Sequence, residues 1–267
     1  MLLDWQYLDK ILIYESIKRY NEAVIDGICE MPLESIVRLS IREQKQCISS
    51  IWYKEIITKL SVKFPLLKQV RNLNGRHYFD LVDSSIIGIF PLQCEDDFLS
   101  QRWIDFRGKM VSALKNAGCK HNLSHALSHA MSELADNIIQ HSEPHGTLVF
   151  KGIAAFAVVD NYLSIVISDA GRGILASLRE NSKNKLLKTD MEAIVAAAKD
   201  NCSRREDNMG TGFRQLFQSI ADLHGEVHIV SGCGRVVFKG IGQKSLTVIT
   251  STSEIGSHVF IKCIFKK

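Results

Sequence analysis

The sequence has 267 residues, enough for one large domain or for a domain with a substantial extension. Apolar residues make up 46% of it and charged residues 23%, which is ordinary for a soluble globular protein. The net charge of +4 permits an acidic partner but does not by itself indicate nucleic acid, and nothing else in the sequence supports one.

The cysteines and the apolar runs indicate the compartment. Seven cysteines are scattered without a Cys-x-x-Cys pair, which is typical of reduced thiols in a cytosolic protein rather than of a disulfide framework or a zinc site. Asp4 and Lys10 interrupt the opening apolar residues, so we expect no signal peptide. The longest apolar run, near residues 152–159, is too short to cross a bilayer. We expect a cytoplasmic protein without membrane contact.

The first part of the chain, residues 1–92, is predicted to be mainly helical. Apolar residues recur at helical spacing between Leu8 and Ile17 and again between Ile36 and Ile56, with a break near Pro32. Two short strands follow at residues 77–82 and 86–90, the second ended by Pro91. We interpret this part as an accessory region that packs on the main domain, or that binds a protein partner or a second copy of the chain. Its two strands could equally join the main sheet.

The second part, residues 93–267, is predicted to form the main domain. Helices are expected over residues 96–117, 121–141, 190–199 and 212–224. Strands are expected over residues 147–150, 153–159, 162–168, 227–230, 235–239, 246–250 and 257–265. Helices followed by a mostly antiparallel sheet predict an α/β fold, a two-layer α/β sandwich with an N-terminal mainly helical extension.

Three segments carry candidate chemistry. Glu133 and Asn137 are four residues apart on a predicted helix, so their side chains lie one turn apart on the same face. Asp169 ends a predicted strand and is followed by Gly171 and Gly173, which let the backbone turn sharply and approach a ligand. The third segment is Gly210–Thr211–Gly212, at the start of a predicted helix where free N–H groups favour phosphate oxygens.

These segments, in this order, resemble the motifs of the GHKL superfamily of Bergerat-fold ATP-binding domains, which includes gyrase, heat-shock chaperones, sensor histidine kinases and anti-sigma serine kinases. Glu133-x-x-x-Asn137 is similar to the family's N box. Asp169-x-Gly171-x-Gly173 and Gly210-x-Gly212 are similar to its two glycine boxes. Ser257 occupies the place where the family often has a threonine near the adenine. The resemblance covers about residues 123–265.

The resemblance implies a site for ATP and Mg²⁺. Asp169 would recognise the adenine amino group, and Asn137 would hold Mg²⁺ through its amide oxygen. Glu133 would be the general base. His141 would lie near the base or ribose, and Arg204 with the adjacent Arg205 would reach the phosphates as a lid over residues 174–209 closes.

The expected function is that of a Mg-dependent ATP-binding protein whose slow hydrolysis switches the lid and the N-terminal region. Gyrase-like members of the family bring a lysine from a second domain, whereas this sequence ends at Lys267, so we do not expect fast hydrolysis. One alternative is an anti-sigma-like protein serine kinase that regulates a partner protein, which His141 favours. The second is an interaction module stabilised by nucleotide without turnover.

Three other patterns have simpler interpretations. His121, His125 and His129 step along one helix face, but a metal ion would use two of them at most. Residues 240–245 resemble a phosphate loop but lack the glycine before the lysine, which favours a hairpin turn. Asp169 to Gly173 could be a simple turn or, with Ala176, a dinucleotide-binding fingerprint, which requires a β-α-β unit.

Overall fold

The structure is a computed structural model that describes residues 30–44, 51–73, 78–82, 85–141, 151–199, 217, 220, 223, 225–239 and 245–265. The statements below concern these residues. None of their helices is both long and apolar enough to span a membrane.

One six-stranded sheet runs through the described part of the molecule. Its strands are β1 (Tyr78–Val82), β2 (Ser85–Leu92), β3 (Gly152–Val159), β4 (Tyr162–Asp169), β5 (Glu226–Lys239) and β6 (Ser245–Ile264). Their order in space is β1-β2-β3-β4-β6-β5, and every neighbouring pair is antiparallel. The predicted α/β class and the mostly antiparallel sheet are confirmed.

Two details of the strand prediction were wrong. The four short strands expected at the C-terminal end are two long ones, because a bulge between Ser231 and Gly234 lets β5 continue in register with β6. Pro91 does not end β2 either. Among the described residues, the pairs of β1 with β2 run from Tyr78↔Ile89 to Val82↔Ser85, so the missing N–H of Pro91 interrupts none of these pairs.

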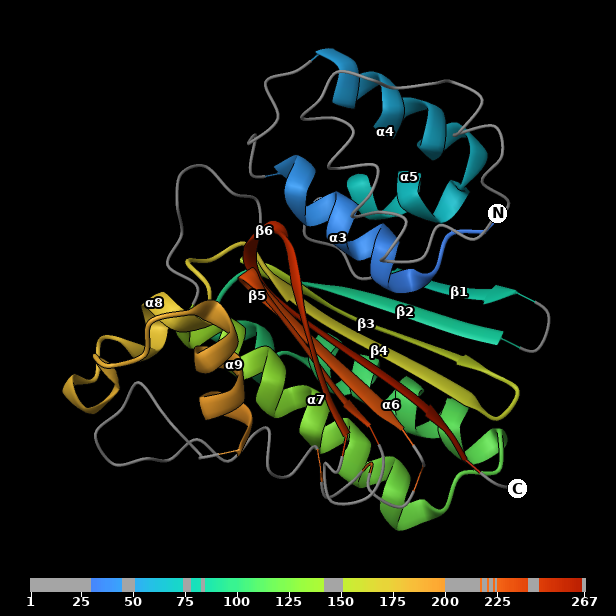
Figure 1. The fold of residues 1–267 in the computed structure, drawn as a ribbon. Coiled ribbons are helices and arrows are strands. Elements are labelled where there is room, and N and C mark those ends of the chain that lie inside the picture. Colours follow the sequence, from blue (N-terminus) through green and yellow to red (C-terminus); the bar gives the residue numbers. More distant parts are fainter. Residues whose placement is uncertain are drawn as a thin grey trace.

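Helices cover both faces of the sheet (Figure 1). On one face lie α3 (Leu33–Gln44), α4 (Ile51–Lys63) and α5 (Pro65–Arg71). On the other lie α6 (Gln101–Asn116) and α7 (His121–His141). The 3₁₀ turn η1 (Glu95–Leu99) precedes α6, and α8 (Ile174–Leu178), the 3₁₀ turn η2 (Ser182–Asn184) and α9 (Asp190–Lys199) follow β4. The N-terminal helices, which the sequence predicted as an extension packed on the main domain, thus cover the face of the sheet opposite α6 and α7. That the structure is a Bergerat fold stays a prediction.

The pattern of buried residues on β3 explains the two helical layers. Ala154, Phe156 and Val158 pack in the core beneath α6 and α7. The alternate residues Ile153 and Ala155 pack in a second core with α3 and α5. Successive side chains of a strand point to opposite faces, so a strand that is apolar at every position needs an apolar cover on both.

The N-terminal strands belong to this same sheet. β2 pairs with β3 from Ile86↔Val158 to Leu92↔Gly152. The expected domain boundary between residues 92 and 93 thus separates β2 from β3, its partner in the sheet. That the two parts are separate domains stays a prediction.

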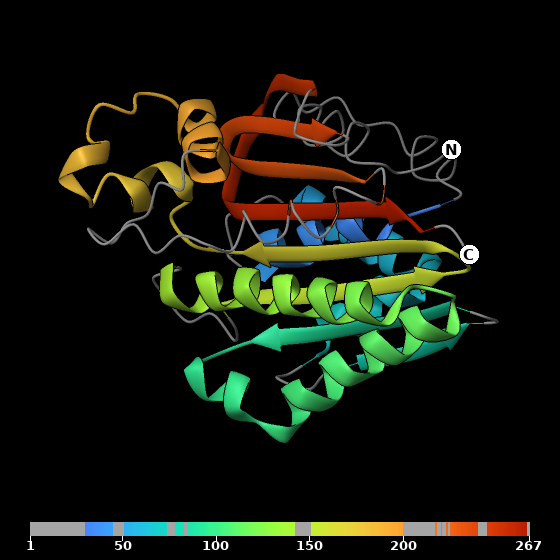
Figure 2. The same ribbon diagram turned by 90° about the horizontal axis from the view of Figure 1, so that it is seen from below.

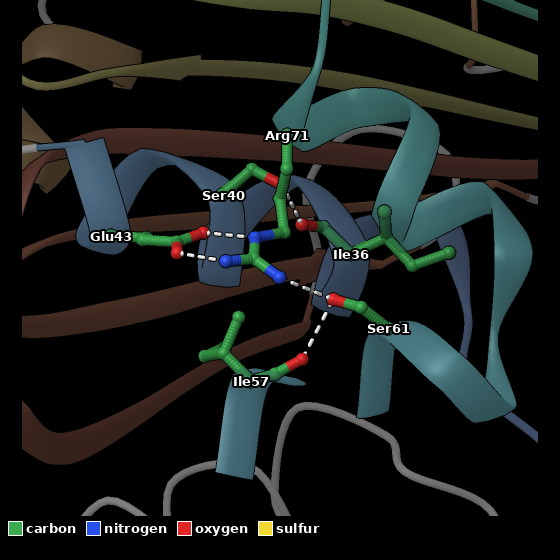
Figure 3. Close-up of polar contacts among 6 residues, drawn as sticks. All are labelled: Ile36, Ser40, Glu43, Ile57, Ser61 and Arg71. Carbon is green, nitrogen blue, oxygen red and sulfur yellow. Dashed lines mark hydrogen bonds and ion pairs between the residues drawn. The ribbon is translucent and has the colours of Figure 1, made fainter. Parts of the chain in front are cut away.

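A polar network joins the three N-terminal helices (Figure 3). The Arg71 guanidinium on α5 donates from Nε and Nη2 to the two carboxylate oxygens of Glu43 on α3, at 2.6 Å each. Its Nη1 donates to the hydroxyl of Ser61 on α4 at 2.8 Å. Ser61 in turn donates to the carbonyl oxygen of Ile57 at 2.7 Å. One planar side chain therefore fixes the relative positions of α3, α4 and α5.

We expect Arg71→Lys to lower the free energy of unfolding by about 1 kcal/mol, because an ammonium group cannot make the paired hydrogen bonds of a guanidinium and the pair is partly exposed. Urea unfolding of the two proteins measures the difference. Lys68→Ala, an exposed change on the same helix, is the control and should alter the free energy of unfolding much less. Equal effects of the two substitutions would contradict the role given to Arg71.

Candidate functional site

The site begins where α7 and β4 end. Leu127, Ala130 and Leu134 bury one side of α7 against the sheet, and Glu133 and Asn137, both half-buried, belong to its last turns. Figure 2 shows the C-terminal end of α7 at the same end of the sheet as the C-terminal end of β4. The helix that carries Glu133 and Asn137 thus leads toward the strand end that carries Asp169.

Asp169 is the buried acid of this region, with 8% of its surface exposed. It alternates with Ile165 and Ile167, which pack in the core under α7, so it lies on the α7 face of the sheet. Its Oδ1 accepts a hydrogen bond from the Gly171 N–H at 2.6 Å. Burial raises the pKa of Asp169 above its usual range, against the opposing effects of the Gly171 hydrogen bond, the His258 ring and two hydrogen bonds from Ser257.

Ser257 on β6 completes the surroundings of this carboxylate. Both its backbone N–H and its hydroxyl donate to Asp169. The structure thus brings Asp169, Gly171 and Ser257 together, although 88 positions separate Asp169 from Ser257 in the chain (257 minus 169).

Two glycines let the chain segments approach so closely. Gly256 has φ +74°, and a Cβ there would lie 2.0 Å from the carbonyl oxygen of Asp169. Gly173 has φ +85°, and a Cβ there would lie 2.8 Å from the Ser231 hydroxyl oxygen. Only glycine fits both the conformation and the space at these positions. The close packing of the protein's own segments explains these glycines without a ligand.

Ser231 is a positioning residue that the sequence reasoning missed. Its buried hydroxyl accepts from the Ile174 N–H at 2.8 Å and donates to the Gly256 carbonyl oxygen at 3.2 Å. It therefore joins the turn after Asp169 to the β6 segment that covers Asp169. The only sequence signal is a serine that interrupts an apolar strand just before a glycine.

The segment after the turn is anchored at both ends. Arg172, between Gly171 and Gly173, forms an ion pair with Glu180 just after α8, at 2.5 Å. Asp190, the first residue of α9, accepts from the backbone N–H of Cys233 on the β5 bulge at 2.9 Å. A Cβ on Gly234 would lie 2.8 Å from the α9 backbone, so β5 and α9 are in direct contact. Within the expected lid, the start of α9 is thus packed against β5.

Several predicted site residues lie outside the described part of the chain. These are Arg204, Gly210, Thr211 and Gly212, together with the side chain of His141, whose backbone ends α7. Of the helix expected over residues 212–224, Phe217, Ile220 and Leu223 are described, and all three are buried in the core under α7. The second glycine box and the phosphate-binding arginine stay predictions.

The other patterns can be compared with the structure in part. β3 and β4 form an antiparallel hairpin before Asp169, which is not the parallel β-α-β unit of a dinucleotide-binding fingerprint. β5 and β6 pair from Lys239↔Ser245 onward, as expected on either side of a hairpin turn. His121 and His125 are exposed with ring centroids 4.6 Å apart. Across the described ranges, no three histidine, cysteine or acidic side chains are grouped so that they would hold a metal ion.

No protein-family model matches this chain, and no curated protein has a detectably similar sequence. The interpretation of the site therefore depends on its residues and their geometry.

The burial of Asp169 predicts a pH dependence. Because the folded pKa lies above the unfolded value of about 3.9, the contribution of Asp169 to stability is greatest below that pH and declines as the pH rises through the folded pKa. Asp169→Asn removes this titration. The unfolding free energy of the variant relative to the unsubstituted protein should therefore increase from about pH 4 to pH 7. Urea unfolding at several pH values measures this difference, and a difference that is constant or declines with pH would show that Asp169 is not desolvated.

Proposed function

We propose that this chain is a Mg-dependent ATP-binding protein of the GHKL type whose slow hydrolysis of ATP drives a conformational switch. The observation that carries the proposal is the buried carboxylate of Asp169, held at the end of β4 by donors from Gly171 and Ser257.

The hydrogen-bonding capacity of Asp169 fits a ligand that donates. A carboxylate has about four acceptor positions, and protein donors occupy three of them: the N–H groups of Gly171 and Ser257 and the hydroxyl of Ser257. With these three donors from the described residues, the carboxylate has capacity for a further donor, and the exocyclic amine of adenine supplies one. A donor here would also offset part of the cost of burying the carboxylate.

The proposed roles on α7 follow from the chemistry of its side chains. The amide oxygen of Asn137 is a suitable ligand for Mg²⁺, which prefers oxygen ligands and, when bound, neutralises charge on the phosphates. The carboxylate of Glu133, one turn earlier and half-buried, would take a proton from the attacking water. Because both residues occupy the C-terminal half of α7, the helix would present them together toward the phosphates.

The packing of α3 on the sheet supports a route from the site to the N-terminal region. Val166 of β4, Ala170 just after β4 and Phe260 of β6 pack in the same core as Val37 of α3. These positions lie one or a few residues from Asp169 and Ser257 but face the opposite side of the sheet. A change in β4 or β6 on nucleotide binding would therefore be transmitted to α3 by direct packing.

The first test is nucleotide binding by Asp169→Asn. ATP with Mg²⁺ at one hundred times its dissociation constant should stabilise the unsubstituted protein by about 2.7 kcal/mol. The variant should lose most of this stabilisation, because an amide group would direct N–H donors toward the adenine amine or toward Ser257. Thermal unfolding with and without ATP measures it.

The control for this test is Asp160→Asn. Asp160 is an exposed residue with φ +52°, a conformation that asparagine also tolerates, so the stabilisation by ATP should persist in this variant. If the unsubstituted protein gains no stability from ATP and Mg²⁺, the chain is an interaction module without this ligand and the proposal is wrong.

The second test is Glu133→Ala. We expect ATP hydrolysis to fall by about a hundredfold or more, the usual contribution of a general base, with stabilisation by ATP retained. Unchanged hydrolysis would remove Glu133 from the mechanism. Radiolabelled ATP incubated with a cell lysate separates the alternative activity, because transfer of label to a protein would support a serine kinase and free phosphate alone supports the ATPase.

A further inference from the structure

Three exposed histidines lie along one face of α7. His121, His125 and His129 follow one another at intervals of four residues, and all three side chains are exposed. Side chains four residues apart on a helix lie one turn apart on the same face. The histidines occupy the N-terminal half of α7, whereas the proposed ATP site uses its C-terminal half. The proposed function therefore gives these imidazoles no role.

The first two imidazoles lie against each other. The ring centroids of His121 and His125 are 4.6 Å apart, and the ring planes are tilted by 37°. The nitrogens of neutral imidazole are the commonest metal ligands that a protein offers. Because both side chains are exposed, each ring is free of tight packing and can rotate about its Cβ–Cγ bond to turn a nitrogen toward a shared ion. The pair can thus bind one ion through two nitrogens.

The distance between the two rings favours one coordination geometry. When an imidazole nitrogen binds a metal ion at about 2.1 Å, the centre of its ring lies about 3.2 Å from the ion. Ring centroids 4.6 Å apart then subtend an angle of roughly 90° at the ion. A tetrahedral Zn²⁺ ion needs about 109°, which would separate the centroids by about 5.2 Å. The pair fits adjacent corners of a square-planar or tetragonal ion better, and this is the geometry of Cu²⁺ and Ni²⁺.

The neighbouring charges restrict the choice of ion further. The positive charges of Lys115 and Arg107 act on His125. They oppose every cation, and hard ions such as Mg²⁺ and Ca²⁺, which take oxygen ligands, gain little from imidazole in return. Cu²⁺ and Ni²⁺ bind nitrogen ligands more strongly than the earlier divalent ions of the first transition row. The surroundings of the pair therefore select for the same two ions as its geometry.

The third histidine does not complete this site. His129 is eight residues from His121, about 12 Å along the helix axis, so one ion cannot bind both. A pair of His125 with His129 is the competing arrangement on the same helix face. The ring contact lies between His121 and His125, which selects the first pair.

We propose that His121 and His125 form a binding site for one square-planar or tetragonal divalent ion, Cu²⁺ or Ni²⁺, with water in the remaining positions. This proposal does not depend on nucleotide binding, so its test can fail while the proposed function stands.

The first test is titration calorimetry of the full chain with Ni²⁺, which does not oxidise thiols as Cu²⁺ does. Because two ligands on one helix bind an ion cooperatively, His121→Ala and His125→Ala should each weaken Ni²⁺ binding by about tenfold or more. His129→Ala is the matched control: it removes an exposed histidine from the same face and should leave the affinity unchanged. Alanine is the most favourable residue in a helix, so all three variants should fold. Zn²⁺ should bind the unsubstituted protein more weakly than Ni²⁺ does.

The second test is the electron paramagnetic resonance spectrum of one equivalent of Cu²⁺, after accessible thiols have been blocked with iodoacetamide. Nitrogen hyperfine coupling should show two equatorial imidazoles in the unsubstituted protein and in His129→Ala, but not in His121→Ala. Equal Ni²⁺ affinities of the unsubstituted protein and His125→Ala would overturn the proposal. So would binding that is lost in His129→Ala and kept in His121→Ala, since that would assign the ion to His125 and His129.

Discussion

The burial of one carboxylate sets the geometry of the candidate site. Asp169 ends β4 on the α7 face, and β6 passes so close to it that position 256 has no room for a side chain. An ionised carboxylate in such a place is stable only if donors surround it, and Gly171 and Ser257 provide them. Ser231 then fixes the turn and β6 relative to each other, so the positions of three chain segments follow from the need to satisfy Asp169 and its neighbours.

The second constraint is the sheet that is buried on both faces. α6 and α7 cover one core and α3 and α5 cover the other, so the N-terminal helices are part of the structure that supports β4 and β6. The ion pair between Glu34 on α3 and Lys262 on β6 adds a polar link across the same interface. The proposed switch thus has a physical connection to the N-terminal region, through residues on the reverse side of the strands that carry Asp169 and Ser257.

The sequence predicted local features well and contacts between distant segments poorly. The helix over residues 121–141 and the hairpin of β3 and β4 follow from apolar periodicity and a tight turn, both local signals. The apolar run from Ile153 to Val158 predicted a strand, but the sequence did not predict its second apolar cover, which lies more than a hundred residues away in α3. Ser231 bonds to Ile174, 57 residues away, and Asp190 bonds to Cys233, 43 residues away. The apolar periodicity of a sequence does not predict such contacts. The resemblance to the GHKL motifs implied that Asp169 and Ser257 lie near the same group, and Ser257 does donate hydrogen bonds to Asp169.

The central claim is that Asp169 accepts a hydrogen bond from the exocyclic amine of adenine. Calorimetric titration with ATP and with the analogue that has hydrogen in place of the 6-amino group, on the unsubstituted protein and on Asp169→Asn, tests it as a thermodynamic cycle. The account predicts that loss of the amine weakens binding to the unsubstituted protein by about tenfold or more, the effect of a hydrogen bond to a charged group, and changes binding to the variant little. Equal affinities of the unsubstituted protein for the two nucleotides would contradict it.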